Sequence, residues 1–130
     1  MIWKSDLDIG IENMNNQHKK LIDLMGILYD NNEKSVDKKV LEKNMSDLFD
    51  YTVRHFKEEE KYLESNDYSG LPTHKIIHQD LLAKLKTHYE SFQNGDNTNI
   101  SDEVFVFLNF WLSSHIKGID MKYGKELSNS

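Results

Sequence analysis

The sequence contains no cysteine and only one proline among its 130 residues. The absence of cysteine excludes disulfides, zinc–thiolate sites, iron–sulfur clusters, cysteine nucleophiles and covalently attached c-type haem. Any metal in this protein must therefore be held by nitrogen and oxygen. With one proline, six glycines and segments rich in leucine, lysine and glutamate, the composition favours an all-α protein over a β-sheet protein.

A concentration of positive charge is also missing. No dense run of lysine or arginine occurs, and the formal net charge is −6 at pH 7. Binding to nucleic acid or to an anionic membrane depends on neutralising phosphate charge, so neither partner is expected. No apolar run approaches the length of a membrane span, and residues 1–6 form no apolar leader. We therefore expect a monomer in the cytoplasm, with no protein partner indicated.

The length and the hydrophobic content of 38% allow one domain with a sizeable core, over residues 1–130. Turn-rich connections divide the chain and predict four helices, over residues 16–31, 37–64, 72–93 and from 101 onward. Short connections place successive helices antiparallel, in an up-down-up-down four-helix bundle. Residues 1–14 lack a helical period, and we interpret them as an N-terminal arm laid over the bundle and tied down by Trp3.

Two pairs of side chains that can bind metal occur at helical spacing in the middle of the chain. His55 and Glu59 are four residues apart, as are His74 and His78, so the members of each pair face the same way. Both pairs also fall on the apolar seam that faces the core of a bundle. A buried carboxylate and several buried imidazoles are unfavourable unless they are paired or bind a metal. The pattern therefore indicates a metal site inside the bundle.

Two further histidines, His18 and His115, lie on the inward seams of the first and fourth predicted helices. Taken alone, His18 is more often a capping or surface residue, and His115 a hydrogen-bonded core residue. Pairs of histidines, or of histidine and glutamate, four residues apart also recur by chance on solvated faces. The combination is stronger, because each of the four helices then contributes an inward histidine. The helical rise brings His55 only loosely to the level of the next helix's pair.

Asp120 is the least regular candidate ligand. It lies five residues after His115, so a regular helix would turn it about 140° away from that histidine. Gly118 lies between them, and a π-type distortion, with its i to i+5 ring, would bring both side chains to one face. We therefore predict such a distortion near residues 115–120. The alternative is that Asp120 is an ordinary surface charge.

The number of candidate ligands discriminates among metals. Five imidazoles and two carboxylates are too many for one tetrahedral zinc and too rich in nitrogen for calcium or magnesium. They suit two adjacent iron-like ions joined by bridging carboxylates. His88 lies ten residues beyond His78, roughly 15 Å along the helix axis, and is expected to be a core or rim residue rather than a ligand. The expected role of Tyr62, Tyr89 and Tyr123 is packing with polar tips.

These residues, taken together and in order, resemble the pattern of the hemerythrin family, and in particular its single-domain bacterial members. The matching features are Gln17-His18-Lys19, His55-Phe56-x-x-Glu59-Glu60, His74-x3-His78, and His115-x4-Asp120 followed by Tyr123. They span nearly the whole chain. One departure is Asn15, because the family often has an acidic residue three positions before the first histidine.

The resemblance implies a non-haem di-iron site. Three histidines would hold one iron, and two would hold the other, which keeps an open position for dioxygen. Glu59 and Asp120 would bridge both irons, together with an oxo or hydroxo group. The two implied sets are His74, His78 and His115, and His18 and His55. Leu112, one turn before His115, is the first choice for an apolar pocket wall, with Trp111 and Met25 as further choices; simple core packing is the alternative.

The function that the resemblance implies is reversible oxygen binding, for storage, transport or delivery, without enzymatic turnover. One alternative is a di-iron enzyme, such as a peroxidase or a nitric-oxide-consuming protein. The Glu-x-x-His spacing of ferritin-like di-iron oxidases is absent here, which favours binding over oxidation. Another alternative is an oxygen sensor that acts through a separate partner protein.

Overall fold

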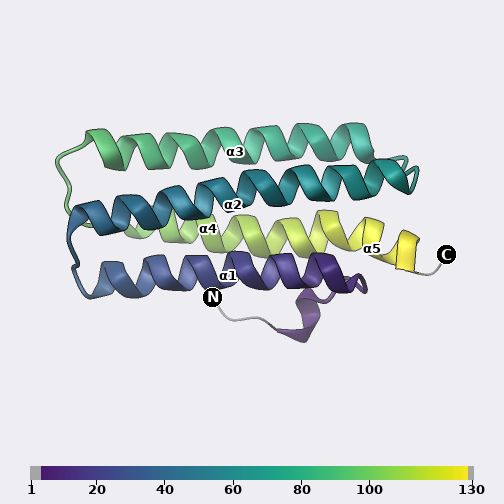
Figure 1. Cartoon of the computed structure of the whole chain (residues 1–130), viewed down its shortest axis with the longest axis horizontal. Helices are drawn as coiled ribbons and strands as arrows, with labels where there is room; N and C mark the ends of the chain where they lie inside the picture. Colours follow the sequence, from purple (N-terminus) through teal and green to yellow (C-terminus); the bar gives the residue numbers. More distant parts are fainter. Residues whose placement is uncertain (1–3, 129–130) are drawn as a thin grey trace.

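Four long antiparallel helices run side by side in the computed structural model, which describes residues 4–128 (Figure 1). In chain order the elements are the 3-10 turn η1 (Ser5–Leu7), the helices α1 (Glu12–Glu33), α2 (Lys38–Ser65), α3 (Leu71–Asn94) and α4 (Asp102–Ser114), the π-helical segment η2 (His115–Asp120) and the helix α5 (Met121–Ser128). Segments η2 and α5 continue the line of α4, so the three together form the fourth rod of the bundle. The predicted all-α, up-down-up-down four-helix bundle is confirmed.

Local chemistry accounts for the helix boundaries. The side chain of Asp37 accepts a hydrogen bond from the backbone N–H of Lys39 at 3.1 Å and so caps the start of α2. Pro72 occupies the first turn of α3, where its missing N–H is not needed. Helices α2, α3 and α4 therefore begin within about one residue of the predicted positions. None of the helices within residues 4–128 is both long enough and apolar enough to cross a membrane.

The first helix begins earlier than predicted, at Glu12 rather than Asn16, so the arm is shorter than residues 1–14. Met14 is buried and extends the apolar face of α1 by one turn toward its N-terminus. The helical spacing of buried residues therefore continues upstream of Asn16, the predicted start of the helix. Trp3, the predicted anchor of the arm, lies outside the described residues.

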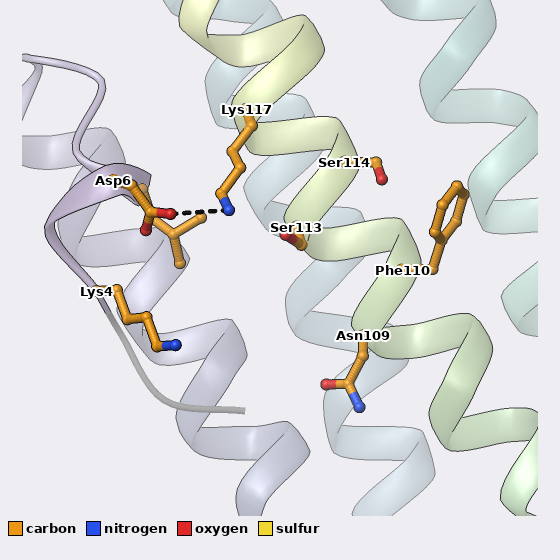
Figure 2. Close-up of a pocket in the computed structure, with 8 residues that line it drawn as sticks. Lys4, Asp6, Asn109, Phe110, Ser113, Ser114 and Lys117 are labelled. Atoms are coloured by element: carbon orange, nitrogen blue, oxygen red, sulfur yellow. Dashed lines mark ion pairs between the residues drawn. The ribbon is translucent and has the colours of Figure 1, made fainter.

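The arm is held against the bundle by side chains on both of its faces. Leu7 and Ile9 are buried in the core, and Lys117 of η2 forms an ion pair with Asp6, with 2.8 Å between Nζ and Oδ2 (Figure 2). Asn15 accepts a hydrogen bond from the backbone N–H of Ile9 at 3.0 Å and donates one to Asp8 at 2.7 Å. An amide can do both, whereas a carboxylate can only accept. The departure at Asn15 therefore fastens the arm to α1.

The two halves of the bundle differ in chemistry. Leu28, Met45, Leu85 and Leu108 pack in the half away from α5, where the interior is apolar. The other half contains the N-terminal part of α1, the C-terminal part of α2, the N-terminal part of α3 and η2. Antiparallel packing brings these four segments to one level, and all of the candidate ligands are carried by them.

Gly124 tests the packing of the arm on α5. A Cβ atom added there would lie 2.3 Å from the carbonyl oxygen of Ile9, so Gly124→Ala must displace the arm. We expect it to lower the free energy of unfolding by about 1–3 kcal/mol. Gly26 in α1 is the matched control, because no atom of the described residues outside the helix's own backbone lies within 4 Å of its added Cβ.

Gly26→Ala is expected to raise the free energy of unfolding by about 0.5–1 kcal/mol, because alanine favours a helix more than glycine does. Thermal and denaturant unfolding followed by circular dichroism would compare the two variants. Equal stability in both would contradict the close contact between the arm and α5.

Candidate metal centre

The seven predicted ligands converge in the interior of the bundle, and each of them is buried. Helix α1 supplies one, α2 two, α3 two and η2 two. In that order they are His18, His55, Glu59, His74, His78, His115 and Asp120. Two overlapping groups have ligand atoms within 4.8 Å of one another, namely Glu59, His74, His78 and His115, and His18, His55 and Glu59. Glu59 belongs to both groups.

Glu59 lies at the centre of this cluster and divides it in two. Its Oε1 is 2.6 Å from Nε2 of His74 and 3.0 Å from Nε2 of His78. Its Oε2 is 3.3 Å from Nε2 of His55 and 3.7 Å from Nε2 of His18. Each carboxylate oxygen therefore faces a different set of histidines, which is the arrangement of a carboxylate that bridges two cations.

The two carboxylate oxygens of Asp120, on η2, also face different histidines. Its Oδ1 is 3.1 Å from Nε2 of His115 and 3.3 Å from Nε2 of His74, whereas its Oδ2 is 3.1 Å from Nε2 of His18. The predicted π distortion is present as η2 and places Asp120 on the same face as His115. Asp120 has no exposed surface, which rules out a role as a surface charge.

The hydrogen-bond inventory of the cluster tests whether cations fit. Among residues 4–128, the buried polar atoms without a hydrogen-bond partner include both ring nitrogens of His18 and of His115, the Nε2 of His78 and both carboxylate oxygens of Asp120. Buried polar atoms are nearly always satisfied, because leaving one unpaired costs about 1–3 kcal/mol. Cations between the Nε2 atoms and the carboxylates would satisfy the inward-facing atoms of this group, and would leave the outer Nδ1 of His18 and of His115 unpaired. The donor set, imidazole nitrogen and carboxylate oxygen without sulfur, fits iron.

Comparison with known proteins agrees with this geometry. The family model described as "Hemerythrin HHE cation binding domain" matches residues 9–127. The chain belongs to the hemerythrin family. Bacteriohemerythrin of Clostridium acetobutylicum is 32% identical over 126 residues, which cover 94% of this chain and 97% of that one. Bacteriohemerythrin of Stenotrophomonas maltophilia is 30% identical over 127 residues, which cover 98% of this chain and 81% of that one.

A solved structure confirms the hemerythrin fold. The crystal structure of a wild-type hemerythrin superimposes with a TM-score of 0.89 at 27% sequence identity, covering 98% of both chains. The resemblance inferred from the sequence motifs is thus confirmed over nearly the whole chain.

In the metal-free cluster, the buried carboxylates and the histidines stabilise each other in their charged forms. Burial alone would raise the pKa of Glu59, but the surrounding histidines hold it well below its usual range. Burial and the charge of Glu59 likewise oppose ionisation of Asp120, yet His115 and His18 keep its pKa low. Both carboxylates are therefore ionised, as ligands must be. In the metal-free cluster, burial disfavours a charged His18 or His74, but attraction to the same carboxylates raises each pKa to about 9.

Several side chains that the sequence analysis did not assign to the centre support its ligands from outside. The Nδ1 of His55 donates to Oε1 of Gln17 at 2.6 Å, and the Nδ1 of His78 donates to Oε2 of Glu60 at 2.7 Å. Such partners fix the ring orientation and leave the inward nitrogen free for a metal. Both supporting residues belong to the quoted motifs, so their sequence position was a usable signal.

Two aromatic side chains also contact the centre directly. The ring of Phe56 stacks on that of His78, with 3.6 Å between centroids and an interplanar angle of 3°. The hydroxyl of Tyr123 donates to Oε2 of Glu59 at 2.9 Å. The expectation of packing alone for Tyr123 was therefore incomplete.

The remaining predicted residues are placed as follows. Leu112 and Trp111 are buried in α4, and the Trp111 ring centroid lies 6.1 Å from that of Phe56, beside the centre. Met25 is buried too, but it lines a cavity with Leu108 and other residues, about two turns along α1 from His18. His88 packs against Phe107 at 4.8 Å between ring centroids and is outside the cluster, as predicted.

A pair of histidines on α3 provides a test of the ligand set. His78→Ala removes one of three imidazoles from a group and should lower the metal content well below that of the unchanged protein. His88→Ala removes an imidazole from the same helix but from outside the cluster, and should leave metal content intact. Elemental analysis of both purified variants would measure the effect. Equal loss in both would contradict the assignment.

Proposed function

We propose that this chain binds dioxygen reversibly at a pair of iron ions bridged by an oxo or hydroxo group. Membership of the hemerythrin family supports oxygen binding at a di-iron site. The single observation that carries the proposal is the division of the cluster by Glu59, whose two oxygens face different sets of histidines. An arrangement of this kind suits two adjacent metals better than one.

The proposed assignment follows the distances. His74, His78 and His115 would hold one iron, and His18 and His55 the other, with Glu59 and Asp120 shared by both. The position with two histidines has one protein ligand fewer, so it is the position at which a small molecule can enter. When bound, the iron pair supplies the two electrons that reversible binding of dioxygen requires.

The protein's own residues would protect the centre and hold its carboxylate in place. Leu112, Trp111 and Phe56 are buried and supply an apolar, water-poor wall, with Met25 farther along the bundle. Burial and the charge of Glu59 raise the pKa of Tyr123, so its hydroxyl keeps its proton and continues to donate to Glu59. Tyr123 would thus position the carboxylate of Glu59 through a hydrogen bond rather than supply a proton.

A carrier is favoured over an enzyme within this proposal. The ligand set has five imidazoles and two carboxylates, and lacks the Glu-x-x-His pairs of ferritin-like di-iron oxidases. Leu112 and Phe56 are buried apolar side chains near these ligands. Storage, transport and local delivery all use this same chemistry.

The proposal is tested by iron content together with absorption spectra recorded through repeated cycles of air and vacuum. We expect two irons per chain and charge-transfer bands that appear in air and disappear under vacuum without loss over several cycles. Irreversible bleaching with turnover of an added reductant would overturn the carrier function in favour of an enzyme. Fewer than two irons per chain would overturn the di-iron site itself.

Leu112 tests the role of the apolar wall. Leu112→Ala should let water reach the centre and shorten the lifetime of the oxygenated form several-fold, measured as decay of its absorption bands at a temperature below the unfolding transition. Val106→Ala is the control, because it truncates a side chain on the same helix that is 67% exposed. Equal lifetimes in the two variants would show that Leu112 only packs the core.

A further inference from the structure

The outer nitrogens of the cluster's histidines, the Nδ1 atoms that point away from the cluster, have different hydrogen-bond acceptors. His78 donates directly to the carboxylate of Glu60, whereas His55 donates to the neutral amide of Gln17. Hydrogen bonds to charged acceptors are roughly twice as strong as neutral ones. A charged acceptor also makes the imidazole a stronger metal ligand. The two sets of ligands therefore differ in donor strength as well as in number.

The neutral amide is held in one orientation by a third residue. Nε2 of Gln17 donates to Oε2 of Glu58 at 2.7 Å, and a carboxylate can only accept, so the amide nitrogen must face Glu58. The amide oxygen is thereby aimed at Nδ1 of His55, which must carry the proton. Arg54 pairs with the other oxygen of Glu58 at 3.4 Å, at the surface of the protein. A relay thus runs from the surface through Glu58 and Gln17 to His55.

His18, the second histidine of this set, has no outer support. Its Nδ1 is buried and makes no hydrogen bond within the part of the chain that the structure describes. The set of His18 and His55 thus combines two imidazoles, one neutral partner and no charged partner. The set of His74, His78 and His115 combines three imidazoles with the carboxylate of Glu60. Within residues 4–128 the Nδ1 of His115 also has no partner, so the two sets differ in the number of imidazoles and in the charged acceptor rather than in their unpaired outer nitrogens. The shared carboxylates contribute to both sets and do not change this difference.

From this asymmetry we propose that the two metal positions differ in affinity, and that the position of His18 and His55 fills last and empties first. Gln17 and Glu58 are its positioning residues. The inference rests on the proposed di-metal site and adds an order of assembly to it. A chain with one metal would hold it at the position with three histidines and would lack the position proposed to receive dioxygen.

Exchanging the side chains of Gln17 and Glu58 would alter the relay while keeping the hydrogen bond between these two positions and the one to His55. In the double variant Gln17→Glu with Glu58→Gln, the new carboxylate accepts from His55 and from the new amide, so the charge moves one step closer to the metal. The net charge of the chain is unchanged. The exposed ion pair with Arg54 is lost, but such pairs contribute little to stability.

The experiment is a competition titration of the cobalt(II)-loaded full-length protein with a chelator of known affinity, followed by the visible absorption of cobalt. In the unchanged chain we expect two steps, with dissociation constants at least about tenfold apart. The exchange variant should tighten the weaker step by about tenfold and leave the tighter step unchanged. Glu60→Gln should instead weaken the tighter step.

Two further variants assign the steps to positions. His18→Ala should abolish the weaker step and keep the tighter one, whereas His115→Ala should weaken the tighter step. Glu58→Ala, which frees the amide of Gln17, should weaken only the weaker step. Its matched control is Asp47→Ala. Like Glu58, Asp47 is the acidic member of an i,i+4 ion pair on α2, and the side chains of both residues are 45% exposed.

The outcomes separate this inference from the proposed function. Equal affinities, a reversed order, or an exchange variant with an unchanged weaker step would overturn the inference. Two ordered steps in a protein whose iron form does not bind oxygen reversibly would overturn the proposed function and leave the inference standing. Binding of a single cobalt ion per chain would overturn both.

Discussion

The structure depends on the burial of two ionised carboxylates and five imidazoles inside a small bundle. Removing these groups from water is energetically unfavourable. Charges in such surroundings are tolerated only when they are paired or bound to metal. Glu59 and Asp120 have no exposed surface, and several nitrogen atoms of the neighbouring histidines make no hydrogen bond to any of the described residues. Cations between the carboxylates and the inward-facing nitrogens would complete the cluster, and the rest of the fold keeps these groups at one level.

The fold meets this constraint by placing an apolar core in one half of the bundle and the ligands in the other half. The half away from α5 is packed with leucine, methionine and phenylalanine and supplies the stability of an ordinary apolar core. In the other half, the ligands occupy part of the interior. The arm packs against this half through Leu7 and Ile9, and the ion pair between Lys117 and Asp6 attaches it to η2. The arm therefore stabilises the segment η2 that carries two of the ligands.

Much of this was predictable because ligands and core residues share one helical period. The four helices and the two pairs His55/Glu59 and His74/His78 follow from spacing, whereas the full set of seven ligands also required the resemblance to the hemerythrin family. The π distortion was predicted because Asp120 can join His115 only if the helix widens. The roles of Gln17, Glu60 and Tyr123 did not follow, because a hydrogen bond between helices depends on their relative level and on side-chain rotamers. The early start of α1 was missed because Met14 stands among polar residues.

The central claim is that two metals share one carboxylate pair, and iron K-edge X-ray absorption of the reconstituted protein tests it most directly. The account predicts a nitrogen- and oxygen-containing inner shell together with a second iron atom as a near scatterer. Thiolate sulfur cannot belong to that shell, because the sequence contains no cysteine. Spectra that show iron without an iron neighbour would contradict the account, because Glu59 would then not join two metal positions.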